Sequence, residues 1–276
     1  MGSVKKELAK QGITPKKRLG QHFLVDINIL NKVVKTAEVS REDVVLEVGP
    51  GLGEMTFALS QKAKKVIAIE IDPRLVEQLR IKFEGIPNLE FIQADVLQYD
   101  FTSLLQQAGK PLKVVSNLPY QISTPLIFRF IENREIFTSL TLMLQKEVAR
   151  RLVSPPGREE YGPLSIFVQR VSDISICFYV KPNAFFPPPK VESAVIQLKW
   201  KKKPLFDLKD EEWFKKIVHG CFNYRRKTLI NGLKYSGIHL PEDFEQRMKR
   251  VQLDPQRRPE TLSIKDFFYL SEILRP

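Results

Sequence analysis

The chain has 276 residues, of which 43% are hydrophobic and 28% charged, and its formal net charge is +12. This length is enough for one large core plus a smaller domain. No uncharged apolar run approaches the roughly 20 residues of a membrane span, and the N-terminus has no apolar signal segment. We therefore expect a cytoplasmic protein that makes no membrane contact. The two cysteines lack metal-ligand spacing, so we expect no metal site.

The excess of positive charge is concentrated at the two ends of the chain. Residues 1–20 carry a net charge of +5 and residues 200–276 a net charge of +6, whereas residues 21–199 carry only +1. A near-neutral centre with basic ends is typical of a catalytic core flanked by elements that bind a polyanion. The alternative is that these charges only keep the surface solvated.

The sequence divides into three predicted parts. Residues 1–19 form a basic N-terminal arm, and residues 20–200 contain the strand and helix patterns of an α/β domain with a mixed sheet of about seven strands. The basic run 199–204 marks a boundary. Residues 201–276 show helical periodicity throughout, interrupted by prolines, which predicts a small all-helical domain.

A glycine-rich loop and two acids follow the first three predicted strands. The strand 44–48 leads into the loop 49–53 and a helix, which is the arrangement that lets a backbone approach a nucleotide-like ligand. The strand 66–69 ends in Glu70, where an acid can bind a ribose diol. The strand 89–92 ends near Asp95, which could accept from an adenine amine or only cap the next turn.

The acids favour S-adenosylmethionine over a dinucleotide. A dinucleotide needs a pyrophosphate seat at the helix N-terminus. Here the loop contains Pro50 and is followed by Glu54, whose negative charge would repel a diphosphate. S-adenosylmethionine has no phosphate and carries a sulfonium cation, so an acid-rich pocket suits it better.

The loop after the fourth strand carries the expected chemistry. The apolar run 112–115 predicts a buried strand that ends at the loop Asn117-Leu118-Pro119-Tyr120. Open α/β sheets bind ligands at the carboxyl ends of their strands. Asn117 and the backbone carbonyls can accept N–H bonds from a planar amine, and Tyr120 can stack on the ring that carries it. The alternative is a strand end followed by a simple proline turn.

Three further strands and two motifs complete the chain. Strands are predicted at 140–144, 174–180 and 193–199, and the last two are separated by a proline-rich loop that could hold Phe185 or Phe186 over a pocket. In the helical part, Arg225, Arg226 and Lys227 are candidates for phosphate contacts.

Eight motifs are distributed over nearly the whole chain: GQHFL, EVGPGLGEMT, IEID, QAD, NLPYQIS, MLQKEVARRL, FFPPPKVESAV and FNYRRKTL. Their order and spacing resemble the KsgA/RsmA family of small-subunit ribosomal RNA adenine dimethyltransferases. The resemblance implies a Rossmann-like class I methyltransferase domain with a basic helical C-terminal domain. It places cofactor contacts at His22, Leu24, Gly49, Glu70, Asp95 and Asn117.

The resemblance also implies a reaction. The enzyme would act as a monomer, with S-adenosylmethionine as the methyl donor and without a metal. It would methylate N6 of two adjacent adenosines in the 3′-terminal hairpin loop of 16S rRNA, and its substrate would be the immature small ribosomal subunit. The base would be flipped between Tyr120 and Phe185, while Asn117 and the Leu118 carbonyl accept from N6. Two alternatives remain open. One is a large-subunit rRNA adenine methyltransferase of the macrolide-resistance type, and the other is a non-catalytic nucleic-acid-binding or transcription factor.

Overall fold

The computed structural model describes residues 14–16 and 19–275. The chain contacts define two compact units. Unit 1 contains the residues up to Ala149 together with Asp173–Trp200, and unit 2 contains Arg150–Ser172 together with Lys201–Pro276. The chain therefore enters unit 2 twice, at Arg150 and again at Lys201. Residues 150–172 are the difference, because the predicted division placed them with the sheet.

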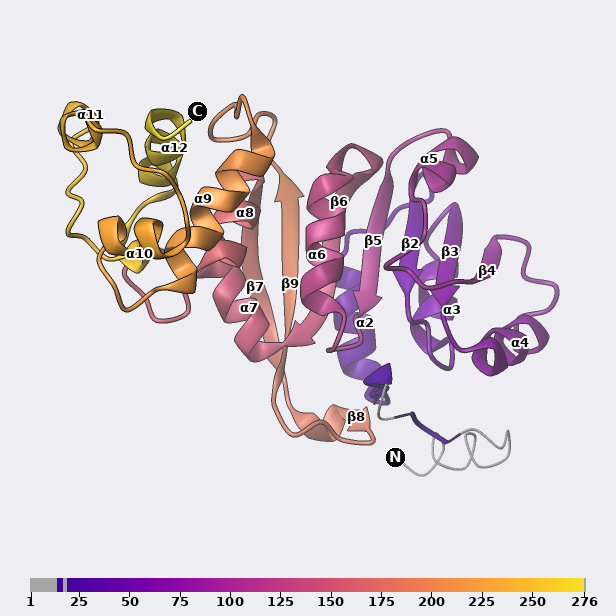
Figure 1. Ribbon diagram of the computed structural model, residues 1–276. Helices are drawn as coiled ribbons and strands as arrows, with labels where there is room; N and C mark the ends of the chain where they lie inside the picture. Colours follow the sequence, from indigo (N-terminus) through magenta and orange to yellow (C-terminus); the bar gives the residue numbers. More distant parts are fainter. Residues whose placement is uncertain (1–13, 17–18, 276) are drawn as a thin grey trace. The chain divides into compact units, whose positions relative to one another are not determined.

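Unit 1 is built on a seven-stranded mixed sheet with the order β4-β3-β2-β5-β6-β9-β7, which agrees with the predicted number of strands (Figure 1). The strands are β2 (Val44–Val48), β3 (Lys65–Glu70), β4 (Leu89–Gln93), β5 (Leu112–Asn117), β6 (Phe137–Gln145), β7 (Ser172–Val180) and β9 (Ser193–Trp200). Strands β2 to β6 are parallel, and β9 runs antiparallel to β6. All five residues of β2 are buried, as expected for a central parallel strand covered on both faces.

The helices of unit 1 connect these strands. They are α2 (Ile27–Thr36), α3 (Glu54–Ser60), α4 (Pro73–Lys82), α5 (Thr102–Ala108) and α6 (Ser123–Glu132), followed by the short η2 (Arg134–Ile136) and η3 (Pro182–Ala184). The chain leaves β2 toward β3 and leaves β5 toward β6, in opposite directions across the sheet. Right-handed crossovers therefore place α3 and α6 on opposite faces, and α6 is on the near face in Figure 1. The carboxyl ends of β2 and β5 thus form a topological switch point, where such sheets bind ligands.

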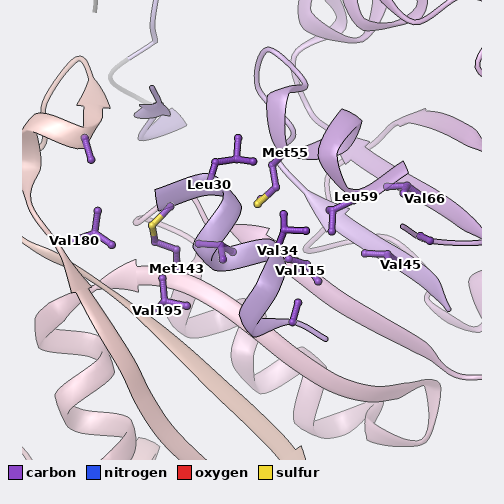
Figure 2. Packing of buried hydrophobic residues seen from close by; sticks show 14 of the residues in the cluster. Leu30, Val34, Val45, Met55, Leu59, Val66, Val115, Met143, Val180 and Val195 are labelled. Carbon is purple, nitrogen blue, oxygen red and sulfur yellow. The ribbon is translucent and has the colours of Figure 1, made fainter. Parts of the chain in front are cut away.

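One face of the sheet is covered by α2 and α3. Asp26 caps α2 by accepting from the backbone N–H groups of Asn28 and Ile29. Apolar residues from both helices pack on branched side chains of the sheet, as Figure 2 shows for Leu30, Val34, Met55, Leu59, Val45, Val66, Val115, Met143, Val180 and Val195. This packing keeps the strand ends in a fixed register, because close-packed side chains resist small displacements.

A second, two-stranded sheet joins the two ends of unit 1. Strand β1 (Phe23–Leu24) pairs antiparallel with β8 (Phe185–Phe186), so that Phe23 lies opposite Phe186 and Leu24 opposite Phe185. The backbone N–H of Val25 extends the ladder by donating to the Ala184 carbonyl at 2.8 Å. The ladder attaches the GQHFL motif to the proline-rich loop.

Unit 2 is helical. Its helices are the end of α7 (Lys146–Val153), α8 (Pro163–Val171), α9 (Glu211–Asn223), α10 (Leu229–Tyr235), α11 (Phe244–Arg250) and α12 (Ile264–Ile273), with the short η4 (Pro259–Thr261). Helix α9 buries Phe214, Ile217, Val218 and Cys221. The nearly buried guanidinium of Arg170 in α8 pairs with Glu211 at the start of α9, which attaches residues 150–172 to the C-terminal helices. No helix among the described residues is long and apolar enough to span a membrane.

The glycine loop gives a test of this packing. Gly53 has φ +85°, and a Cβ there would lie 2.4 Å from Phe83 Cε2 and 2.6 Å from Leu79 Cδ2. Gly85 has φ +83° with nothing within 4 Å of such a Cβ. Both Gly→Ala substitutions strain the backbone by about 1–2 kcal/mol. Gly53→Ala should lower the free energy of unfolding by about 1–3 kcal/mol more than Gly85→Ala does, through overpacking. Urea unfolding should show this difference, and equal decreases in the free energy of unfolding of the two variants would contradict the packing described.

Candidate active site

A cavity in unit 1 lies at the carboxyl ends of the central strands. Its lining includes eight of the predicted site residues: His22, Leu24, Gly49, Glu70, Asp95, Asn117, Leu118 and Tyr120. Gly49, Glu70, Asp95 and the Asn117-Leu118-Pro119-Tyr120 loop lie at the carboxyl ends of β2, β3, β4 and β5. His22 and Leu24 come from β1 and the residue before it. Residues that are up to 98 positions apart in the chain therefore share one site.

The glycine loop forms one wall of the cavity. The Gly49 N–H donates to the Ile69 carbonyl at 2.9 Å, which holds the loop beside the end of β3. Gly51 has φ +60°, and a Cβ there would lie 2.9 Å from Phe23 Cδ1. The loop can approach β1 this closely only because it has no side chain at that position.

Glu70 and Asp95 are both oriented by backbone N–H groups. The Oε1 atom of Glu70 accepts from the N–H groups of Ile71 and Asp72, both at 2.9 Å. Burial raises the pKa of Glu70, and these N–H groups oppose the rise. Asp95 Oδ1 accepts from the Leu97 N–H at 2.9 Å. Both acids thus lie in the cavity with a fixed side-chain orientation, which suits binding of hydroxyl or amine groups.

A third acid, Glu47, was not predicted as a site residue. It lies in β2, lines the cavity and is 1% exposed. Neither carboxyl oxygen has a hydrogen-bond partner among the described residues. Burial raises the pKa of Glu47 to about 8, the negative charge of Glu70 adds to the rise, and the Thr56 hydroxyl acts against it. An unpartnered buried carboxyl is costly unless a ligand pairs with it.

The Asn117 side chain is held in one orientation. Its Nδ2 donates to the His22 carbonyl at 3.0 Å. A carbonyl can only accept, so the amide nitrogen must face His22, and Oδ1 is left on the other side of the amide. The Leu118 N–H donates to the Met143 carbonyl at 2.9 Å, and the Ser116 hydroxyl donates to the Val48 carbonyl at 2.5 Å. These bonds fix the loop on both neighbouring strands.

Tyr120 lies against His22. Their ring centroids are 5.4 Å apart with an interplanar angle of 29°. The Tyr120 hydroxyl lies 2.5 Å from the Ser193 Oγ, and His22 Nδ1 lies 2.7 Å from the Pro187 carbonyl oxygen. Both rings are therefore anchored at their polar ends, which leaves the Tyr120 ring positioned at the cavity wall.

Phe185 does not have the position predicted for it. Its ring is 0% exposed and belongs to the core cluster with Leu30, Met143 and Val195. Phe186 packs against Phe23, Leu52 and Leu75 instead. Neither ring lines the cavity, so the prediction that Phe185 stacks on a base opposite Tyr120 is wrong for this conformation. The aromatic neighbour of Tyr120 is His22.

A model of the ribosomal RNA adenine dimethylase family matches residues 12–275. The chain belongs to this family. It is 41% identical to the ribosomal RNA small subunit methyltransferase A of Shouchella clausii, with 97% of this chain and 92% of that protein covered. The enzyme of the same name from Geobacter metallireducens is 42% identical, with coverages of 96% and 97%.

Solved structures of similar fold agree with this assignment. A dimethyladenosine transferase from Plasmodium falciparum gives a TM-score of 0.74 at 29% identity, with 90% of this chain and 96% of that chain covered. The 23S rRNA methyltransferase ErmE gives 0.69 at 25% identity, with coverages of 92% and 100%. The predicted Rossmann-like methyltransferase fold is confirmed.

The predicted phosphate-binding residues of this rRNA adenine dimethylase lie in unit 2, after α9. Arg226 and Lys227 are exposed and form no ion pair with a described residue. Arg225 differs, because its Nε lies 4.0 Å from Glu260 and its Nη2 donates to the Arg158 carbonyl at 3.3 Å. Arg225 therefore holds the loop at residue 158 as well as carrying charge.

The predicted basic arm lies mostly outside the described residues. Of its lysines, Lys16 is described, and its Nζ lies 3.0 Å from the buried carboxylate of Asp72. The Lys16 N–H also donates to Gln21 Oε1 at 2.8 Å. This lysine thus attaches the chain to the rim of the cavity, close to Glu70. The described residues contain no group of His, Cys, Asp and Glu that could hold a metal ion.

The raised pKa of Glu47 gives a prediction for stability. In the folded protein the carboxyl binds its proton up to about pH 8, whereas the unfolded chain releases it near 4.5. The folded state therefore binds more protons between these values, and stability falls as pH rises, by at most about 1.4 kcal/mol per pH unit. Glu47→Gln should flatten this slope in urea unfolding between pH 5 and 8. Parallel slopes for the two proteins would contradict a buried, protonated Glu47.

Proposed function

We propose that this chain dimethylates N6 of two adjacent adenosines in the 3′-terminal hairpin loop of small-subunit rRNA, with S-adenosylmethionine as the methyl donor. Family membership and the names of relatives at 41% and 42% identity support this proposal. The observation that carries it is the orientation of Asn117 at the cavity, with its nitrogen committed to His22.

The donor fits the acids of the cavity. Bound S-adenosylmethionine supplies an electrophilic methyl group on a sulfonium cation. Glu70 would bind the ribose hydroxyls and Asp95 the adenine amine, with His22, Leu24 and Gly49 completing the contacts. The buried Glu47 carboxyl lines the same cavity, and a cationic ligand beside it would favour its charged form. Glu54 contributes less, because Lys82 pairs with it at 2.8 Å.

The acceptor amine would be positioned by the Asn117-Leu118-Pro119-Tyr120 loop. Asn117 Oδ1 and the Leu118 carbonyl can each accept one N–H bond from N6, and this draws the nitrogen lone pair out of conjugation with the ring. The Tyr120 ring stacks on the base. Positioning of the amine in line with the methyl group supplies most of the rate. No strong base is needed, since the methylated ammonium is acidic and loses its proton to water.

Two alternatives are less well supported. A large-subunit rRNA methyltransferase shares the fold, but ErmE is only 25% identical to this chain. A non-catalytic nucleic-acid-binding factor would not need three acids and an oriented amide around one cavity. Action on immature small subunits, as a monomer in the cytoplasm, is part of our proposal.

Asn117→Ala tests the assignment of this residue. Loss of the oriented acceptor should lower the methylation rate by about 10²-fold or more at saturating cofactor, by analogy with removal of an oriented hydrogen-bonding group from other active sites. RNA affinity should change little, because phosphate contacts dominate it. Single-turnover transfer of labelled methyl groups and RNA binding by anisotropy measure the two effects.

Asn183→Ala is the matched control, because Asn183 is exposed and does not line the cavity. It should methylate at the wild-type rate. A wild-type rate in Asn117→Ala would remove Asn117 from the mechanism.

A further inference from the structure

Two exposed tyrosines lie together on the surface of unit 2. Tyr224 follows the last residue of α9 and Tyr235 is the last residue of α10. Their side chains are 38% and 61% exposed, and their ring centroids are 5.4 Å apart with an interplanar angle of 38°. Most other large apolar side chains of the unit are buried or half-buried. An exposed aromatic pair therefore needs an explanation beyond core packing.

The packing of the helices does not require the Tyr235 ring. Helix α9 buries Ile217 and Cys221 and helix α10 buries Leu229 and Leu233, whereas the Tyr235 side chain is 61% exposed. Neither tyrosine hydroxyl bonds to another described residue. More than half of the surface of the Tyr235 side chain is in contact with water.

Three cations lie close to the pair in the chain, and one of them contacts it. The Lys227 Nζ lies 5.9 Å from the centre of the Tyr235 ring, and Arg226 and Lys234 are exposed nearby in sequence. None of these three cations forms an ion pair with a described acid. By contrast, Arg247 pairs with Asp243 and Arg257 with Asp266. The cations next to the tyrosines are thus available for phosphates, whereas others in the unit hold the fold together.

We propose that Tyr235, supported by Tyr224, stacks on one unpaired base of the RNA substrate while Arg226, Lys227 and Lys234 bind the adjacent phosphates. This base is separate from the adenines that are methylated. Aromatic rings beside cations are the common arrangement for binding single-stranded RNA. A paired base in a duplex is already stacked on both faces, so the site selects an unpaired nucleotide. The inference rests on the proposed function, because it assumes an RNA substrate.

The test compares two labelled RNAs of about 12 nucleotides, one single-stranded and one fully paired, bound to the full chain over a range of salt. Tyr235→Leu keeps an apolar side chain but removes stacking. It should weaken single-strand binding about 5-fold or more, with an unchanged salt slope and unchanged duplex binding. Tyr235→Trp should retain the wild-type affinity.

Two further variants separate stacking from charge and from a general effect of tyrosine loss. Lys227→Gln should reduce the salt slope for the single strand by about 0.7. Tyr269→Leu is the matched control, because Tyr269 is half-buried in α12 with the Lys265 Nζ 5.5 Å from its ring. It should bind both RNAs like the wild type.

The outcomes separate this inference from the proposed function. Unchanged single-strand binding by Tyr235→Leu, equal losses for both RNAs, or an equal loss in Tyr269→Leu would overturn the stacking site while methylation still stands. A wild-type chain that binds neither RNA and methylates no rRNA would overturn the proposed function and this inference together. Thermal unfolding of each variant at the wild-type temperature excludes misfolding as the cause of a loss.

Discussion

The site depends on one hydrogen bond, from Asn117 Nδ2 to the His22 carbonyl. Asn117 ends β5, whereas His22 is held by β1, which pairs with β8 more than 160 residues later in the chain. The bond fixes the amide so that Nδ2 faces His22 and Oδ1 lies on the other side. It can form only if the large sheet, the two-stranded sheet and the proline-rich loop are all in place. The orientation of the Asn117 side chain is therefore a consequence of folding at three distant segments.

The acidic side chains of the cavity determine which ligands it can bind. Glu47, Glu70 and Asp95 surround the space next to the glycine loop, and Glu47 has no partner of its own. Removing a carboxyl from water raises its pKa, so that without a ligand Glu47 stays neutral at pH 7. A cationic ligand beside it would lower this pKa and favour the carboxylate, whereas a diphosphate would raise the pKa further.

The sheet could be predicted from the sequence because its parallel strands are nearly continuous apolar runs that end in Gly, Glu, Asp or Asn. The position of Phe185 could not be predicted from the sequence. It depends on the pairing of β8 with β1, and a shift of one residue in that pairing exchanges the directions of the Phe185 and Phe186 side chains. The sequence shows Glu47 as the one acid in an apolar strand. The alternation of side chains between the two faces of a sheet does not tell which face borders the cavity, so its role could not be predicted. The attachment of residues 150–172 to unit 2 rests on Arg170 and Glu211, which are far apart in the chain.

The central claim is that the chain places methyl groups on adenines of small-subunit rRNA. The most direct measurement is methyl transfer by the full chain to immature small subunits from cells that lack this activity, followed by mapping of the modified nucleotides. We predict N6,N6-dimethyladenosine at two adjacent positions in the 3′-terminal hairpin loop. Modification of large-subunit rRNA instead, or no transfer by folded protein that binds S-adenosylmethionine, would contradict the account.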